Sequence, residues 1–422
     1  MISKLYYGPA TDLGAERPAI LRSSFDAGRG LRADRADVSR FPGAMGKVLS
    51  APPTAMAPEP PTPQSRGQLA HSVLAQNLKL RRGEHVLIEA WTHTLPWAVA
   101  FARESRRMGA FPLISYEDEG AYWDSVDANE FKVLGKAAAH EWAALAKADV
   151  YIYPWAPGDR VRLNALPPTK VDQLFAFNEQ WYEVARRAGL RGARLELGRP
   201  YPSLARAYGV DEATWTDQLV RATMVPPDAL AQAGAPLARV LAKGRSVRVR
   251  DSAGTDLRLG LARRPTYVDA GRPILKDRVR RFQMLTTLPS GAVRLALDET
   301  VAEGTLVANR TCFYDDGVAT GAVFHFQDGR LKETEFDRGA ERFEKGFAHG
   351  GVGRDRPGLF SIGLNPALRD TPQLEDLEQG AVMVSVGGNR GFGGKNGSGF
   401  FGWAISAGAT VEVDGRPISG GG

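Results

Sequence analysis

Hydrophobic and polar residues alternate in helix and strand patterns from about residue 66 onward. The apolar spacing over residues 69–78 is that of one helix face. RRGEHVLIEA (81–90) predicts a turn followed by a buried strand, and residues 95–109 predict a helix that ends at a glycine. FPLISYE (111–117) predicts the next strand. A strand, a helix and a second strand in this order predict a parallel sheet with right-handed crossovers.

The same pattern continues through the first half of the chain. ADVYIYPWA (148–156) predicts a further strand. KVDQLFAFNEQWYEVARRAGL (170–190) predicts one helix, with Gly189 near its end. We interpret the tryptophans of this half, Trp155 among them, as core and subunit packing.

The pattern changes after about residue 245. Residues 245–264 alternate and turn at SAGTD, which predicts a hairpin, and residues 321–336 predict a second one. Residues 381–388 and 409–418 predict further strands, and residues 338–347 a short helix. The fold class expected is therefore an α/β domain with a parallel sheet, followed by a mainly antiparallel β (α+β) domain.

The length of the chain, 422 residues, exceeds one ordinary core and predicts two domains. We expect an α/β domain over 66–245 and a β-rich domain over 246–422. Residues 1–65 are expected to form an N-terminal extension, in which the proline-rich stretch 50–65 is an extended linker.

The charge balance argues against a nucleic-acid partner. Lys and Arg number 54 against 48 Asp and Glu, a net charge of +6, and the arginine pairs are scattered rather than arranged in a stripe. No run of 18 apolar residues predicts a membrane span, and the N-terminus lacks the apolar segment of a signal peptide. The single cysteine, Cys312, excludes an internal disulfide, so we expect a cytoplasmic protein.

Residues 393–404, GGKNGSGFFGWA, carry the composition of a loop that bends closely around a site. The stretch contains no His, Asp, Glu or Cys, and its largest side chains are Phe400, Phe401 and Trp403. Its backbone is that of an active-site loop, but it lacks the usual groups for chemistry.

The order of several motifs resembles the M29 family, the aminopeptidase T-like, thermophilic-type metallopeptidases. The resemblance runs from about residue 66 to the C-terminus and rests on LKLRRGEHVLIEA, ARAYGVDEATWTDQLVRAT, GTDLRLGLARR, TLPSGAV, SIGLNPAL, VSVGGNRGFGGKNGS and VDGRPI. It implies a two-domain fold, a homodimer, and two divalent ions that activate a water molecule.

The positions that match the metal ligands of the family hold other residues in this chain. The resemblance places carboxylates and imidazoles at five positions, which here are Ala292, Leu359, Met383, Phe401 and Trp403. A tyrosine near the metals corresponds to Arg390. Since none of the five side chains is a ligand for a hard cation, we expect neither a catalytic metal nor a cofactor.

We expect the former metal cleft to bind a small amino-acid-like or peptide ligand that has a carboxylate and an apolar or aromatic part. Arg390 and Lys395 are candidates for the carboxylate, and Phe401 and Trp403 for the apolar part. The full set of expected ligand-binding residues is Arg263, Ser290, Ala292, Leu359, Met383, Asn389, Arg390, Lys395, Asn396, Phe401 and Trp403. Weak candidates for a catalytic role are Arg390, Lys395, Ser398 and Asp256.

Three functions remain open from the sequence. The first is a repurposed enzyme with metal-free chemistry, and the second is a peptide-binding partner protein without catalysis. The third is a genuine metal-dependent aminopeptidase with unrecognised ligands. We interpret His325 and His349 as structural histidines, and no histidine near Cys312 in sequence supports a thiol nucleophile.

Overall fold

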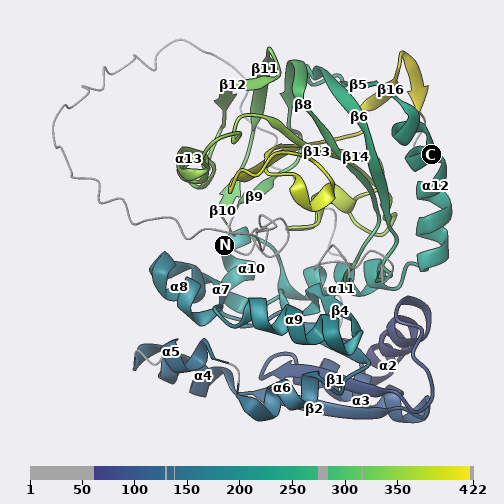
Figure 1. Ribbon diagram of the computed structural model, residues 1–422, viewed down its shortest axis with the longest axis vertical. Coiled ribbons are helices and arrows are strands. Elements are labelled where there is room, and N and C mark those ends of the chain that lie inside the picture. The colour runs from purple at the N-terminus through teal and green to yellow at the C-terminus, as the bar shows by residue number, and fades with distance from the viewer. Residues whose placement is uncertain (1–60, 129–130, 137, 274–283, 315–316, 419–422) are drawn as a thin grey trace, which may run out of the picture. The chain divides into compact units, whose positions relative to one another are not determined.

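The structure, a computed structural model, describes residues 61–128, 131–136, 138–273, 284–314 and 317–418 (Figure 1). The expected N-terminal extension, apart from its last residues, lies outside this range. Among the described residues, no helix combines the length and the apolar content that a membrane crossing requires.

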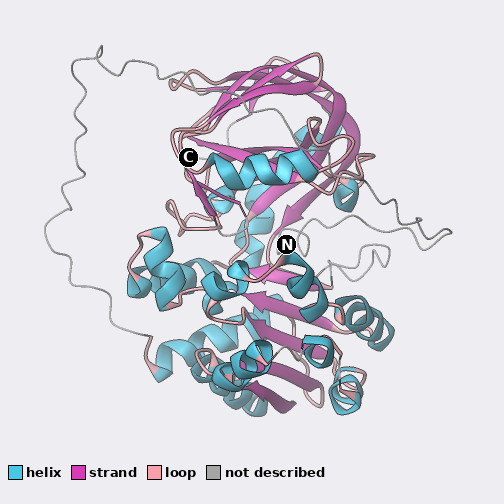
Figure 2. Cartoon of the chain, turned by 90° about the vertical axis from the view of Figure 1, so that its left-hand side faces the viewer, coloured by secondary structure: helices cyan, strands magenta, loops and turns pink. Residues whose placement is uncertain are grey.

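The first sheet is parallel throughout, as the sequence predicted. Its five strands follow the order β2-β1-β3-β4-β7, and helices cover both of its faces (Figure 2). The strands are β1 (His85–Trp91), β2 (Phe111–Glu117), β3 (Val150–Pro154), β4 (Arg191–Leu195) and β7 (Leu285–Leu288). β7 comes from beyond residue 245 and is followed directly by β8 (Ala292–Val307), a strand of the second sheet.

The helical elements of this part are mostly short. They are α2 (Pro63–Ser72), η1 (Val73–Asn77), α3 (Leu95–Arg107), α4 (Glu119–Asp127), α5 (Phe131–Leu134), α6 (Ala139–Leu145), α7 (Arg160–Ala165), α8 (Pro168–Leu174), α9 (Asn178–Ala188), η2 (Glu196–Gly198), α10 (Pro202–Tyr208), α11 (Glu212–Thr223) and α12 (Pro227–Lys243).

Two sequence predictions about these helices need correction. The helix predicted over 170–190 is two helices, because α8 ends at Leu174 and α9 begins at Asn178. The phenylalanines of the intervening turn, Phe175 and Phe177, face a cavity rather than continuing the helical face. The expected linker also ends earlier than residue 65, because Thr62 caps α2 by accepting a hydrogen bond from the Ser65 amide at 3.2 Å.

The second sheet is antiparallel, again as predicted. Its main order is β15-β14-β13-β8-β6-β5-β16-β17, with β11 and β12 joined through β8. The strands other than β8 are β5 (Ser246–Arg250), β6 (Asp256–Asp269), β11 (Val323–Gln327), β12 (Arg330–Glu335), β13 (Pro357–Gly363), β14 (Ala381–Gly387), β15 (Phe401–Ala407), β16 (Thr410–Val413) and β17 (Arg416–Ile418). A separate pair is formed by β9 (Cys312–Tyr314) and β10 (Gly317–Ala319).

Both predicted hairpins of this half are present, as β5–β6 and β11–β12. The strand predicted over 409–418 is wrong in one respect, because it turns at Asp414 and Gly415 and forms the hairpin β16–β17. The short helical elements are α13 (Ala340–His349), η3 (Glu375–Leu377) and η4 (Arg390–Phe392), so α13 lies two residues beyond its predicted range.

The two faces of the second sheet differ in what covers them. Val382, Val384 and Val386 of β14 face the main core, where α12 and Phe343 of α13 also pack. The alternate residues of β14 face the opposite side, on which Met383 lies in a smaller apolar cluster. This second face carries most of the positions that the sequence singled out.

Candidate functional site

The residues at the positions where the resemblance implies metal ligands lie on one side of the second sheet. Met383 lies opposite Ser361 and Ile405, and Leu359 lies opposite Ala296. Leu359, Met383, Ile405 and Ala296 are buried in one cluster, and Phe401 and Trp403 pack against it. The rings of Phe401 and Trp403 are 5.5 Å apart. We call this cluster the apolar face.

Ala292 belongs to the same side of the sheet. It lies opposite Gly363, and Ala296 lies opposite Leu359, so both alanines of β8 point to the same side under the two-residue period of a strand. Ala292 is fully buried and packs in the neighbouring core of the first sheet. All five expected ligand positions are therefore on one side of β8, β13, β14 and β15.

An arginine that the sequence analysis did not single out lies on this side between Ala292 and Ala296. The Arg294 guanidinium donates to Asp269 on β6 at 2.9 Å and to Asp376 in η3 at 2.8 Å. Its side chain is 9% exposed. Burial raises the pKa of Asp269, and the Arg294 charge opposes that rise.

The carboxyl group of Glu375, next to Asp376, is a second feature that the sequence analysis missed. Glu375 is 2% exposed, and neither of its oxygens has a well-formed hydrogen bond within the described residues. Burial raises the pKa of Glu375 well above its usual range, although the Trp403 side chain opposes the rise. Burial therefore favours the neutral, protonated form of Glu375.

The other residues considered for chemistry have structural surroundings. Burial raises the pKa of the Cys312 thiol to about 12, so the thiol stays protonated at neutral pH. His325 contacts Thr305 Oγ1 at 3.1 Å and Glu335 at 2.9 Å across its hairpin. His349 Nδ1 lies 2.7 Å from the Lys345 carbonyl oxygen, at the end of α13.

Two asparagines hold the glycine-rich loop in place. The Asn396 amide N–H donates to Asn389 Oδ1 at 2.9 Å, and Asn396 Nδ2 donates to the carbonyls of Gly353 and Gly387 at 2.7 and 2.8 Å. Asn389 Nδ2 donates to Glu299 at 2.9 Å. A side chain at Gly387 would overlap the carbonyl of Phe400, the residue before β15, and the φ of +97° at Gly387 favours glycine.

Ser398 is also used by the loop itself. Its hydroxyl donates to the Gly350 carbonyl at 2.7 Å and accepts the Phe400 amide N–H at 3.1 Å. The asparagines and this serine thus act as anchors for the backbone of the loop.

Glu299 links the loop to β6. It forms a two-point ion pair with Arg264 at 2.7 and 2.6 Å and accepts the Lys395 backbone N–H at 2.7 Å. Burial alone would raise the pKa of Glu299, but these hydrogen bonds and that of Asn389 outweigh it and lower the pKa to about 2.

A cavity of about 690 Å³ opens beside the loop, and four cationic side chains line it: Arg330, Arg356, Arg390 and Lys395. Arg330 pairs with Asp355 at 2.6 Å, and Arg356 donates to the Gly329 carbonyl at 3.0 Å. Within the described residues, the side chains of Arg390 and Lys395 form no hydrogen bond or ion pair. The remaining lining is Glu299, Gly350, Gly351, Val352, Gly353, Asn396, Gly397, Ser398 and Gly399.

The predicted cleft is thus divided between two places. Arg390, Lys395, Asn396 and Ser398 line the cationic cavity, whereas Leu359, Met383, Phe401 and Trp403 lie on the apolar face. Ala292 packs in the core of the first sheet. Asn389 lies behind the cavity and joins the loop to Gly358 at the start of β13 by a hydrogen bond of 3.2 Å.

Besides Asn389 and Ala292, three predicted residues belong to neither group. Asp256 is exposed and forms an ion pair with Arg248 at 2.7 and 2.6 Å. Arg263 is exposed, with a φ of +52°. Ser290 is buried, and its carbonyl accepts a hydrogen bond from Asn365 at 2.7 Å.

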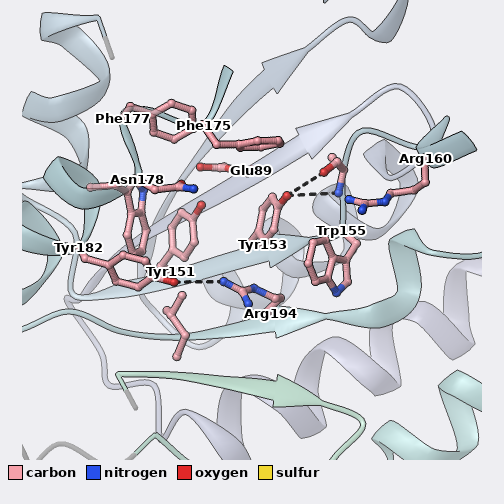
Figure 3. A pocket seen from close by; sticks show the side chains of 13 residues that line it. Glu89, Tyr151, Tyr153, Trp155, Arg160, Phe175, Phe177, Asn178, Tyr182 and Arg194 are labelled. Atoms are coloured by element: carbon pink, nitrogen blue, oxygen red, sulfur yellow. Dashed lines mark hydrogen bonds between the residues drawn. The ribbon is translucent and has the colours of Figure 1, made fainter. Parts of the chain in front are cut away.

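A second cavity, of about 110 Å³, lies on the first sheet and was not predicted (Figure 3). Its lining includes Trp155, which the sequence analysis assigned to core packing. A glutamate within a buried strand, Glu89 in HVLIEAW, is the sequence signal that could have located it.

The comparison with protein families identifies the chain. The model of the thermophilic metalloprotease (M29) family matches residues 64–350, more than half of the sequence. The chain belongs to the M29 family. No curated protein sequence matches it.

Two solved structures share the fold of this chain over most of its length. Wild-type AmpT from Thermus thermophilus is 18% identical, with a TM-score of 0.61, over 84% of this chain and 99% of that one. The 2,5-dihydroxypyridine dioxygenase from Pseudomonas putida KT2440 is 15% identical, with a TM-score of 0.55, over 85% of this chain and 96% of that one. Identities this low establish a common fold and leave the activity to the residues of each site.

Proposed function

We propose that this M29 protein has lost the two-metal centre and uses the region around it to bind a small ligand, or to act on it without a metal. The ligand class is an amino-acid-like or peptide compound with a carboxylate and an apolar or aromatic part. The observation that carries the proposal is the packing of Leu359, Met383, Phe401 and Trp403 into one apolar face.

The donor set of this face does not fit a divalent metal ion. Alkyl and aryl side chains offer no lone pair, and a thioether such as that of Met383 is a poor ligand for a hard cation. Among the described residues, no group of three or more His, Cys, Asp or Glu side chains is arranged to hold a metal ion. No step of the proposed chemistry is therefore routed through a metal.

Arg294 supports the same proposal from the charge of the site. Asp269 and Asp376 are carboxylates beside the apolar face, and both pair with the Arg294 guanidinium. A cation supplied by the chain itself thus balances the acidic groups, which otherwise carry a large cost of burial.

The cationic cavity is the proposed place for the carboxylate. Arg390 and Lys395 line it without an acidic partner among the described residues, while Arg330 is already paired with Asp355. A guanidinium group binds a carboxylate through two parallel hydrogen bonds, which favours Arg390 as the main contact.

Elemental mass spectrometry tests the loss of the metal centre. The protein is purified without chelator and without added metal, and an aminopeptidase assay is run beside it. The expected result is substoichiometric Zn, Mn, Co and Fe with no peptidase activity. One or two tightly bound ions per chain would overturn the proposal and restore the reading of a metal-dependent aminopeptidase.

Calorimetric titration tests the carboxylate site. The probe is N-acetylphenylalanine, with its amide as the neutral control ligand. The Arg390→Gln/Lys395→Gln double variant is expected to lose at least tenfold in affinity for the acid. The matched control is Arg416→Gln/Lys332→Gln, which removes two exposed cations that do not line the cavity. Equal loss in both double variants, or preference for the amide, would contradict the proposal.

Catalysis and the homodimer are the two parts of the proposal that need tests of their own. Conversion of a bound ligand to product distinguishes a metal-free enzyme from a peptide-binding partner protein. The homodimer and the cytoplasmic location are proposals that rest on family membership and on the sequence. Sedimentation analysis of the full chain tests the dimer, for which a single monomeric species would be the contrary result.

A further inference from the structure

The cavity on the first sheet has a composition unlike that of the cationic cavity. It holds about 110 Å³ on one face of the parallel sheet. Its floor is formed by residues of β1, β3 and β4, and its roof by the turn between α8 and α9 (Figure 3). An engineered apolar cavity of about 150 Å³ binds benzene, so this smaller one has room for a group of about four or five heavy atoms.

Aromatic rings form a continuous wall along the cavity. The ring centroids of Tyr182 and Trp181 are 5.2 Å apart, those of Trp181 and Tyr151 4.9 Å, and those of Tyr151 and Tyr153 6.3 Å. Trp155 extends the wall at 6.0 Å from Tyr153. The faces of such rings carry partial negative charge and attract cations.

Glu89 is the acidic group of the cavity. In Figure 3 its side chain lies below Phe175 and next to Tyr151, which is its hydrogen-bonding neighbour. Within the described residues, no Lys, Arg or His forms an ion pair with it. A carboxyl group in an aromatic enclosure without a cationic partner has a high cost of burial in its ionised form, and a bound cation removes that cost.

Two arginines also line the cavity. Arg160 and Arg194 lie over the Trp155 ring, with their guanidinium carbons 5.5 and 5.2 Å from its centroid. Arg194 also donates to the Tyr182 hydroxyl at 3.3 Å. Both guanidinium groups thus contact aromatic rings of the wall, and within the described residues neither forms an ion pair with Glu89.

From this arrangement we propose that the cavity is a binding site for a small organic ammonium ion. The ammonium group contacts the Glu89 carboxylate, and its alkyl groups contact the rings of Tyr151, Tyr153 and Trp181. The site does not involve the cationic cavity or the apolar face, so the proposal is independent of the function proposed above.

Titration with a matched pair of probes tests the charge preference. The full chain is titrated with tetramethylammonium and with trimethylacetate, which have similar shapes and opposite charges, and tryptophan fluorescence reports binding. Saturable binding of tetramethylammonium, at least tenfold tighter than that of trimethylacetate, is the expected result. Preference for trimethylacetate, or saturation by neither probe, would overturn the proposal.

Variants separate the site from the fold. Glu89→Gln keeps the shape of the side chain and is expected to lose at least tenfold in tetramethylammonium affinity, and Trp181→Leu several-fold. The controls are Glu333→Gln and Tyr116→Leu, an exposed acid and an exposed aromatic residue outside the cavity. Undiminished binding by a folded Glu89→Gln protein would contradict the proposal.

The pH dependence of binding gives a readout that a purely structural role would not produce. Burial raises the pKa of Glu89 to about 7; the nearby Glu141 adds to the rise, while Tyr151 and Arg194 oppose it. Tyr151 and Tyr153 keep their protons at neutral pH, because burial raises the pKa of both. Since only ionised Glu89 attracts the probe strongly, affinity is expected to be about tenfold higher at pH 8 than at pH 6. A flat profile would contradict the assignment of Glu89.

Discussion

Arg294 on β8 donates to Asp376 in η3 at 2.8 Å, across a sequence separation of 82 residues. The same guanidinium donates to Asp269 on β6 at 2.9 Å. This pairing joins three segments beside the apolar face, at the place where the M29 resemblance implies metal ligands. The chain therefore balances the acidic groups there with its own cation.

Replacement of Arg294 is expected to destabilise the fold strongly. Arg294→Met leaves Asp269 and Asp376 without their cation, and breaking a buried pair costs about 3–5 kcal/mol. Urea unfolding at pH 7 measures the change in the free energy of unfolding. Arg338→Met, at an exposed position, is the control and is expected to change it by less than about 0.5 kcal/mol. A loss of under about 1 kcal/mol in Arg294→Met would mean that the carboxylates need no partner.

Glu299 is expected to make the free energy of unfolding fall as the pH becomes acidic. Its pKa is lowered from 4.5 to about 2 in the fold, so its contribution is complete above pH 4.5 and is lost as the pH falls toward 2. Wild-type protein and Glu299→Gln should differ by up to about 3 kcal/mol at pH 7 and converge near pH 2. Urea unfolding between pH 7 and pH 3 measures this. Parallel curves for the two proteins would contradict it.

Glu89 is expected to lower the stability of the fold as the pH rises, which is opposite to the effect of Glu299. Its pKa is raised from 4.5 to about 7, so the folded state binds the proton more tightly than the unfolded state does. Stability is then lost as the pH rises from 4.5 through 7. The free energy of unfolding of Glu89→Gln should therefore exceed that of wild-type protein by up to about 3 kcal/mol at the upper end of this range. Thermal or urea unfolding at pH 5 and pH 8 checks the gain, and Glu333→Gln, which is exposed, should show none.

Asn396 is expected to control the order of the loop beside the cationic cavity. Asn396→Ala removes the hydrogen bonds to the Gly353 and Gly387 carbonyls and to the Ser398 amide. The expected cost is about 2–3 kcal/mol, because the buried carbonyls lose their donors. Hydrogen exchange should rise over residues 388–400, with Gln327→Ala as an exposed control. Unchanged exchange in the loop would show that the asparagine does not anchor it.

Much of the fold follows from local patterns in the sequence. Strands of period two and helices of period 3.6 predicted the order of β1, α3, β2 and β3, and the change to hairpins after residue 245. The helix over 170–190 was predicted as continuous because its interior has neither Pro nor Gly. The structure breaks it at Phe175, where the ring packs into the cavity of the first sheet, a contact that local periodicity does not report.

The sequence by itself determined the family, the order of the elements and the apolar character of the five positions that resemble metal ligands. The tertiary structure alone decided which of them lie together, that Arg294 pairs with two distant carboxylates, and that Glu89 lies among aromatic rings. The reason is physical: periodicity fixes the face on which a side chain lies within its own strand. Strand order and register set which faces meet, and these depend on contacts between residues far apart in the chain.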